Sequence, residues 1–297
     1  MKNQKQYNAS QRSLLYRMVK QLCPPVMWEQ GRRWFGMTKT TQMVVPVENL
    51  DEDAELRRLA SIPRYVHANV VLRGCSYTMS DAPSFAHMFR TYFVEESYRF
   101  ASLSDNPYIV DCGANVGVGV RYWKTLFPSA RVVALEPDPQ IFDLLVANTS
   151  GLSDVELLRK AAWSADTVLS FAAVGADGGH LSSLADHGDE VVTLEVEAVR
   201  LREYLVGNVD LLKIDIEGAE LEVLRDCQDR LGLVQNLFVE YHSFVGSDQE
   251  LSALFGIIEA AGFRTYSSVE SPAKQPFVCR PVFNCKDFRL NIWCFRN

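Results

Sequence analysis

The chain of 297 residues lacks the long apolar runs that mark membrane proteins. No stretch approaches the roughly 20 consecutive apolar residues that are needed to cross a bilayer. The first thirty residues also lack an unbroken apolar core of the signal-peptide type. Seven cysteines are scattered without a Cys-x-x-Cys pair, and their odd number argues against a disulfide framework. We therefore expect reduced thiols and a cytoplasmic protein.

Basic residues are too few for a dedicated nucleic-acid binder. The chain carries 30 Lys and Arg against 37 Asp and Glu, a formal net charge of -7, whereas contacts to phosphate need a basic surface. Repeats and low-complexity segments are also missing. A hydrophobic fraction of 47% over this length allows one large domain or two small ones. We therefore expect no nucleic-acid partner.

The charge is unevenly spread, because residues 1–50 hold eight Lys and Arg against two acids. Residues 10–23 are typical of an amphipathic helix, with Leu14, Met18 and Leu22 on one side. This basic segment is either a docking arm for a membrane surface or partner protein, or a helical cap packed on the rest of the chain. We favour the cap. A hairpin-and-helix pattern follows this basic segment at residues 65–100. Together they predict an N-terminal extension over residues 1–100 and a second domain over residues 101–297.

A glycine-rich turn follows the short apolar strand that is predicted at residues 108–112. Gly113 and Gly117 in this turn indicate the first half of a nucleotide-binding βαβ unit. Asp111 decides the ligand, because a carboxylate there repels a pyrophosphate and attracts the cationic methionyl end of S-adenosylmethionine. Glu136 ends the next predicted strand and is suited to accept both ribose hydroxyls. These residues predict an S-adenosylmethionine site.

A nicotinamide-dependent dehydrogenase is the main structural alternative, because Gly113, Gly117 and Gly119 also suit the spacing of short-chain dehydrogenases. Such an enzyme needs a Tyr-x-x-x-Lys pair downstream of the turn to handle the proton. The only such pair, Tyr16 and Lys20, precedes the turn. The dehydrogenase interpretation is therefore disfavoured.

Four motifs, in order and spacing, resemble the motif series of FkbM-type methyltransferases. They are Asp-Cys-Gly-Ala-Asn-Val-Gly from Asp111, Leu-Glu-Pro-Asp-Pro from Leu135, Leu-Leu-Lys-Ile-Asp-Ile-Glu-Gly-Ala-Glu from Leu211 and Phe-Val-Glu-Tyr-His from Phe238. The resemblance implies a class I methyltransferase (Rossmann-like) α/β fold, a mostly parallel sheet with helices on both faces. It also implies methyl transfer from S-adenosylmethionine, in that family most often to a hydroxyl oxygen.

The resemblance also implies which residues bind the cofactor. The motif positions that match are Asp111, Gly113, Asn115, Gly117, Glu136 and Pro137. Ala161, after the third predicted strand, would recognise the adenine ring through its backbone. The expected acceptor is a small molecule or glycan, namely a sugar, a glycan or a secondary metabolite. N- or C-methylation and a non-catalytic binding module remain alternatives, although the intact cofactor motif argues against the latter.

The sequence of the second domain predicts alternating strands and helices. Strands are expected at residues 108–112, 131–136, 155–159, 168–172, 190–199, 209–216, 235–242, 263–267 and 288–295, with a helix at 248–261. The strands at 168–172 and 190–199 are additional to the minimal set of strands that this α/β fold needs. The glycine-rich loop 175–183 between them suits closure over a ligand. The last strand is expected to close the sheet. An aromatic stripe in the helix predicted from Pro83 is more often core than pocket wall.

Polar residues at the carboxyl ends of strands are the expected catalytic group, because ligands of open α/β sheets bind there. Asp215 ends the strand at 209–216, and Lys213 is its expected ion-pair partner. Glu240 and His242 share one face of their strand, since side chains alternate with period two. An ordinary histidine pKa of about 6.5 suits a general base. We therefore expect His242 to take the proton of the acceptor, with Glu240 orienting its ring.

Two alternatives stay open for this catalytic group. His180 and His187 compete with His242 for the role of base. Hard oxygen and imidazole ligands for a divalent metal are also present, on Asp215, Glu217, Glu240 and His242. Because their spacing is not diagnostic of a metal site, we assign no metal ligand.

Overall fold

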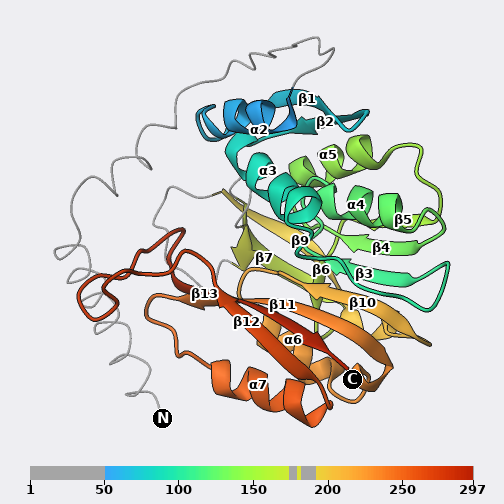
Figure 1. Ribbon diagram of the computed structural model, residues 1–297. Helices are drawn as coiled ribbons and strands as arrows, with labels where there is room; N and C mark the ends of the chain where they lie inside the picture. The colour runs from blue at the N-terminus through green and yellow to red at the C-terminus, as the bar shows by residue number, and fades with distance from the viewer. Residues whose placement is uncertain (1–50, 174–178, 182–191, 297) are drawn as a thin grey trace.

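The computed structural model describes residues 51–173, 179–181 and 192–296, and its centre is a sheet of seven strands. The strand order is β12-β13-β11-β10-β3-β4-β5 (Figure 1). The bounds are β3 Tyr108–Cys112, β4 Arg131–Leu135, β5 Val155–Leu158, β10 Val209–Ile214, β11 Val234–Phe244, β12 Arg264–Val269 and β13 Lys286–Phe295. All pairs from β11 to β5 are parallel, and β13 is antiparallel to both of its neighbours. The predicted α/β fold with a mostly parallel sheet is confirmed.

Helices cover both faces of this sheet, because the buried strands carry apolar side chains on both sides. Ile109 and Leu211 pack with α3 (Ala82–Phe89), α4 (Val118–Leu126) and α5 (Pro139–Thr149), whereas Val110 and Leu212 pack with α6 (Glu220–Cys227) and α7 (Leu251–Ala260). Figure 1 shows the two helical layers above and below the strands. In the described part of the chain, no helix is long and apolar enough to cross a membrane.

The two strands that exceed the minimal pattern belong to a separate sheet of four strands, with the order β6-β9-β7-β8. β7 (Thr167–Ala173) and β9 (Val192–Arg200) match the expected strands, whereas β6 (Ala161–Trp163) and β8 (His180–Leu181) were not predicted. These two are only three and two residues long, too short to show a periodicity. Most of the predicted closing loop at 175–183 lies outside the described residues.

Residues 51–100 share a hydrophobic core with the sheet. α2 (Glu52–Ala60), the hairpin of β1 (Ala68–Leu72) and β2 (Cys75–Met79), α3 and the π-helical turn η3 (Arg90–Val94) pack with α4 and α5. Phe85 and Phe89 of the predicted aromatic stripe are buried in this core, as expected, whereas Met88 and Tyr92 of the same stripe line the cavity described below. The basic segment at residues 1–50 lies outside the described residues. The boundary at residue 100 stays a prediction, although packing is continuous across it.

The last strand does not lie at the edge of the sheet, where a closing strand was expected. β13 is inserted between β11 and β12, and β12 forms the edge. β13 buries Leu290, Ile292 and Cys294, whereas every residue of β12 is exposed. The more apolar strand thus takes the interior position, where both of its edges are also hydrogen-bonded.

Candidate active site

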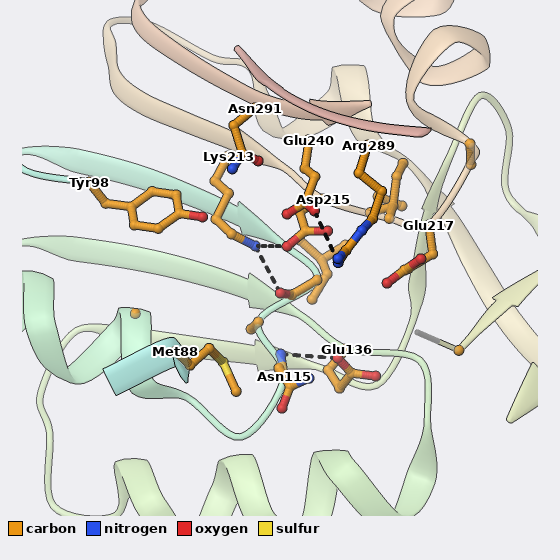
Figure 2. Close-up of a pocket in the computed structure, with 18 of the residues that line it drawn as sticks. Met88, Tyr98, Asn115, Glu136, Lys213, Asp215, Glu217, Glu240, Arg289 and Asn291 are labelled. Carbon is orange, nitrogen blue, oxygen red and sulfur yellow. Dashed lines mark hydrogen bonds and ion pairs between the residues drawn. The ribbon is translucent and has the colours of Figure 1, made fainter. Parts of the chain in front are cut away.

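A cavity of about 650 Å³ lies at the carboxyl ends of the parallel strands. It sits where the strand order reverses between β3 and β10, the switch point at which open α/β sheets bind ligands. Its walls come from the turns after β3, β4 and β10, from the second sheet, and from α3, β12 and β13. Figure 2 shows Asn115 and Glu136 on one side of this cavity and Lys213, Asp215 and Glu240 on the other. The volume suits a ligand of cofactor size.

The turn after β3 approaches β10 so closely that only glycine fits at position 113. Gly113 has φ +86°, and an added Cβ would lie 2.0 Å from the backbone oxygen of Asp215. The backbone N–H groups of Gly113 and Ala114 donate to the Leu135 oxygen at 3.0 and 2.9 Å. Gly117, also at φ +86°, begins α4 and packs against Leu145 from behind the cavity wall. The predicted glycines therefore shape the turn, and Gly113 itself lines the cavity.

Glu136 is a buried carboxyl group in the cavity wall. Its two oxygens accept the backbone N–H groups of Asn115 at 3.0 Å and of Asp138 at 2.9 Å. Burial nevertheless raises the pKa of Glu136 to about 8, because it disfavours the charged form. Asn115 and Pro137 line the cavity beside it, as the cofactor prediction requires. A ligand that donates hydrogen bonds here would favour the ionised carboxylate.

Lys213 joins two acids beneath the cavity. Its Nζ lies 3.3 Å from Asp215 Oδ2 and 3.3 Å from Asp111 Oδ1, and it donates to the Gly113 oxygen at 3.0 Å. The predicted pair of Lys213 and Asp215 is confirmed. The pair with Asp111 was not foreseen, and burial raises the pKa of Asp111 although Lys213 opposes this shift. Because Lys213 lines the cavity and Asp111 is buried behind it, direct contact between Asp111 and a ligand is not favoured.

The second sheet gives the cavity an apolar wall. Ala161 lies in β6 and lines the cavity, together with Trp163, Leu169 and Phe171. Trp163 packs against the core and faces the cavity at the same time. Such a surface suits a planar ring, and the adenine contact of Ala161 stays a prediction.

The ends of β10 and β11 bring Asp215, Glu240 and His242 together. One ligand atom from each of the three lies within 4.8 Å of the other two. His242 Nδ1 is 3.0 Å from Glu220 Oε1, and its Nε2 is 3.5 Å from both Glu217 Oε2 and Glu240 Oε1. Asp215, Glu217 and Glu240 line the cavity. The three residues expected to be catalytic thus form one cluster.

His242 lies behind this cluster, with a side chain that is only 1% exposed. Burial alone would lower its pKa, but the charges of Glu217 and Glu220 raise it well above 6.5. A protonated imidazole cannot accept the proton of an acceptor. Asp215 and Glu240 line the cavity, whereas His242 lies behind them.

The alternative histidines are placed differently. His180 is buried with its ring centroid 5.1 Å from that of Phe244. His187 lies outside the described residues.

One wall of the cavity was missed by the sequence reasoning. It is formed by β12 and β13 through Tyr266, Arg289, Asn291 and Trp293. Arg289, Asn291 and Trp293 alternate along β13 and share one face, so period-two spacing was an available signal. Tyr266 is 65% exposed, and the ring centroids of Tyr266 and Trp293 are 5.7 Å apart. This wall combines aromatic faces with polar groups, as a binding surface for a polar ring would.

The sequence matches a family model described as the methyltransferase FkbM domain, over residues 111–265. Methyltransferase sdnD of Sordaria araneosa is 30% identical over 212 residues, which cover 59% of this chain and 81% of sdnD. Hexuronic acid methyltransferase AglP of Haloferax volcanii is 28% identical over 184 residues, covering 56% of this chain and 75% of AglP. The 31-O-demethyl-FK506 methyltransferase FkbM of Streptomyces tacrolimicus is 25% identical over 206 residues, covering 56% and 78%.

A crystal structure of methyltransferase FkbM from Methylobacillus flagellatus KT is also similar. It has a TM-score of 0.44 and 18% sequence identity, and the match covers 69% of this chain and 47% of that chain. The present chain thus spans about half the length of that protein.

Proposed function

The chain belongs to the FkbM methyltransferase family, and we propose that it transfers the methyl group of S-adenosylmethionine to a hydroxyl oxygen of a sugar, glycan or secondary metabolite. The cavity at the switch point is the observation that carries this proposal. Glu136, an acid suited to bind ribose hydroxyls, lines one part of it, and the acids Asp215 and Glu240 line another. Two relatives, named as methyltransferases of a hexuronic acid and of 31-O-demethyl-FK506, support this acceptor class.

The cofactor would lie between the turn after β3 and the second sheet. Glu136 would accept the ribose hydroxyls, since it is buried and its ionised form needs donors. Asn115 and Pro137 would flank the ribose, and Ala161 would contact the adenine. Gly113 leaves room for the methionyl end beside Lys213. Gly117 and Asp111 would act indirectly, by shaping the turn and by holding Lys213.

The catalytic proposal concerns the cluster of Asp215, Glu240 and His242. Methyl transfer is an in-line displacement in which the acceptor must be aligned and must lose its proton. Asp215 and Glu240 line the cavity and would face the hydroxyl, whereas His242 would fix the position of Glu240 from behind. The earlier assignment of the base to His242 itself needs a neutral ring, which the surrounding carboxylates oppose.

The partners that we propose are small molecules or glycans, with no nucleic acid. The wall of Tyr266, Arg289 and Asn291 supports this, because it offers an aromatic face next to hydrogen-bonding groups. The cytoplasmic setting predicted from the cysteine pattern stays a prediction. So does the cap that we favour for residues 1–50, with a docking arm as its alternative; this segment lies outside the described residues.

Methyl transfer itself tests the proposal. The full chain is incubated with S-adenosylmethionine that carries a labelled methyl group, and with a panel of monosaccharides, uronic acids and hydroxylated macrolides. We expect label in at least one hydroxylated acceptor, and mass spectrometry of the product should show a methyl ether. Label transferred only to amines or to carbon would replace O-methylation by N- or C-methylation on the same fold.

A further inference from the structure

Three potential metal ligands converge at the acid-lined end of the cavity. Asp215 follows β10, and Glu240 and His242 lie in the neighbouring strand β11. A carboxylate oxygen from each acid and one ring nitrogen of His242 all lie within 4.8 Å of one another. Ligands bound to one cation at about 2.1 Å lie about 3.0–4.2 Å apart, so a small rearrangement would bring these atoms into coordination distance.

The ring of His242 is oriented as a metal-binding histidine is. Its Nδ1 is 3.0 Å from Glu220 Oε1, and the same oxygen accepts the backbone N–H groups of Gly218 at 2.9 Å and Ile216 at 3.3 Å. The two backbone N–H groups hold Glu220 Oε1 in place. This oxygen then accepts the Nδ1–H of His242 and so fixes the orientation of the ring. Nε2 then faces the cluster, 3.5 Å from Glu217 Oε2 and from Glu240 Oε1. A carboxylate that fixes the tautomer in this way is the usual partner of a metal-bound histidine.

The contacts of Nε2 are long for hydrogen bonds to carboxylates. Nε2 lies 3.5 Å from Glu217 Oε2 and 3.5 Å from Glu240 Oε1, whereas charged hydrogen bonds of this type are about 2.7–2.9 Å. The spacing therefore leaves room for an ion between the ring and the carboxylates.

The charge around the cluster also calls for a cation. Ion pairs connect five carboxylates around the cluster: Asp111, Asp215, Glu217, Glu220 and Glu240. Among the described residues, the Lys and Arg side chains that pair with them are Lys213, Lys286 and Arg289. Arg289 is in addition shared with Glu270 at 4.0 Å. With His242 left out of the count, five carboxylates stand against three cations. Buried charges need compensation, and one divalent cation would supply it.

We propose that Asp215, Glu240 and His242 bind one divalent cation of the Mg²⁺ or Mn²⁺ type, the class that prefers carboxylate oxygen and accepts imidazole. Its role rests on the proposed function: the cation binds the hydroxyl oxygen of the acceptor and makes loss of its proton to water easier. The oxygen then attacks the methyl carbon, and an O–CH₃ bond forms as the S–CH₃ bond breaks. The electron pair of the broken bond returns to sulfur, which leaves neutral S-adenosylhomocysteine.

Manganese binding tests this site without any acceptor. The full chain is freed of metal with EDTA, dialysed and titrated with MnCl₂, while the electron paramagnetic resonance signal of free Mn²⁺ is followed. We expect one Mn²⁺ per chain. Asp215→Asn and Glu240→Gln should each weaken binding at least tenfold, and Glu220→Gln should weaken it about 10–100-fold through loss of ring orientation.

Glu95→Gln is the matched control, because Glu95 is an acid in the same cavity outside the cluster. It should leave Mn²⁺ affinity unchanged. S-adenosylhomocysteine affinity, measured on every variant, shows that the fold and the cofactor region are intact. Wild-type protein that binds no Mn²⁺ up to about 1 mM, or equal losses in Glu95→Gln and Asp215→Asn, would overturn the metal site. Mn²⁺ binding at this site without methyl transfer to any acceptor would instead contradict the proposed function and leave the site standing.

Discussion

At the scale of single residues, the carboxyl group of Glu136 is the most informative about the cofactor site. It is buried, it accepts two backbone N–H groups, and its pKa is raised to about 8 from the ordinary value of 4.5. Between these two pH values the folded carboxyl group keeps a proton that the unfolded one has released. The contribution of Glu136 to the free energy of unfolding is therefore largest below pH 4.5 and falls as the pH rises to about 8. A stability cost at neutral pH is reasonable for a group that a ligand later stabilises.

The affinity for S-adenosylhomocysteine should consequently depend on pH. Ribose hydroxyls donate to the ionised form of Glu136, so we expect the association constant to rise by up to about tenfold per pH unit below pH 8 and then to level off. Isothermal titration calorimetry from pH 6 to pH 8.5 measures this. Glu136→Gln should bind more weakly at pH 8 and show a flat profile. An equally steep profile in Glu136→Gln would assign the titration to another group.

His242 is the residue whose substitution best separates binding from chemistry. It touches Glu220, Glu217 and Glu240 but lies behind the cavity wall. We expect His242→Ala to keep its S-adenosylhomocysteine affinity within about twofold and to slow methyl transfer about 10²–10⁴-fold, because the acceptor-facing carboxylates lose their position. Single-turnover assays with labelled cofactor measure the chemical step. His67→Ala, which changes an exposed histidine, is the control. A near-normal rate in His242→Ala would remove this residue from the catalytic group.

At the scale of elements, the turn between β3 and α4 fixes the position of the cavity. Gly113 combines a positive φ with a backbone approach that no side chain tolerates, since a Cβ would lie 2.0 Å from the Asp215 oxygen. Gly151 also has a positive φ, of +82°, but a Cβ there would meet no atom within 4 Å. The two glycines thus separate the cost of the backbone conformation from the cost of the close approach.

Alanine substitution should therefore affect the two glycines unequally. Gly151→Ala should lower the free energy of unfolding by about 1–2 kcal/mol, the cost of a left-handed conformation. Gly113→Ala should lower it by about 2–5 kcal/mol, because β10 must also shift. Urea unfolding measures both values. Equal losses would mean that the turn yields easily and does not hold β3 against β10.

The strands that build the site could be predicted because their signals are local. β3, β4, β10 and β11 are apolar runs that end in polar residues, and their predicted bounds agree with the structure within two residues. The placement of β13 and the pair of Asp111 with Lys213 could not be predicted. Both depend on which strands become neighbours, and Asp111 faces Lys213 only because β3 pairs with β10. The cavity wall on β12 and β13 needed the same knowledge of strand order.

At the scale of the molecule, the described part of the chain is built around one sheet with a core on each face. Residues 51–100 belong to one of these cores, so the cavity is enclosed by the N-terminal helix α3 and by the C-terminal strands together. These two parts of the cavity wall are about 200 residues apart in the sequence.

The basic segment at residues 1–50 gives a prediction for the full chain. Under the favoured cap interpretation, we expect no sedimentation with anionic phosphatidylserine vesicles, in low or in physiological salt. A variant that begins at residue 51 should behave in the same way and should melt at a lower temperature. Sedimentation of the full chain that disappears in high salt and in the shortened variant would instead establish a membrane-docking arm.

Binding of S-adenosylhomocysteine is the most direct measurement of the central claim, that the cavity at the β3–β10 switch point holds S-adenosylmethionine. Isothermal titration calorimetry of the full chain at pH 8, against S-adenosylhomocysteine and against NAD⁺ and NADP⁺, decides it. We predict one S-adenosylhomocysteine per chain, no heat with either dinucleotide, and a loss of about 1–3 kcal/mol of binding free energy in Glu136→Ala. Unchanged affinity in a folded Glu136→Ala variant, or binding of a dinucleotide in place of S-adenosylhomocysteine, would contradict the account.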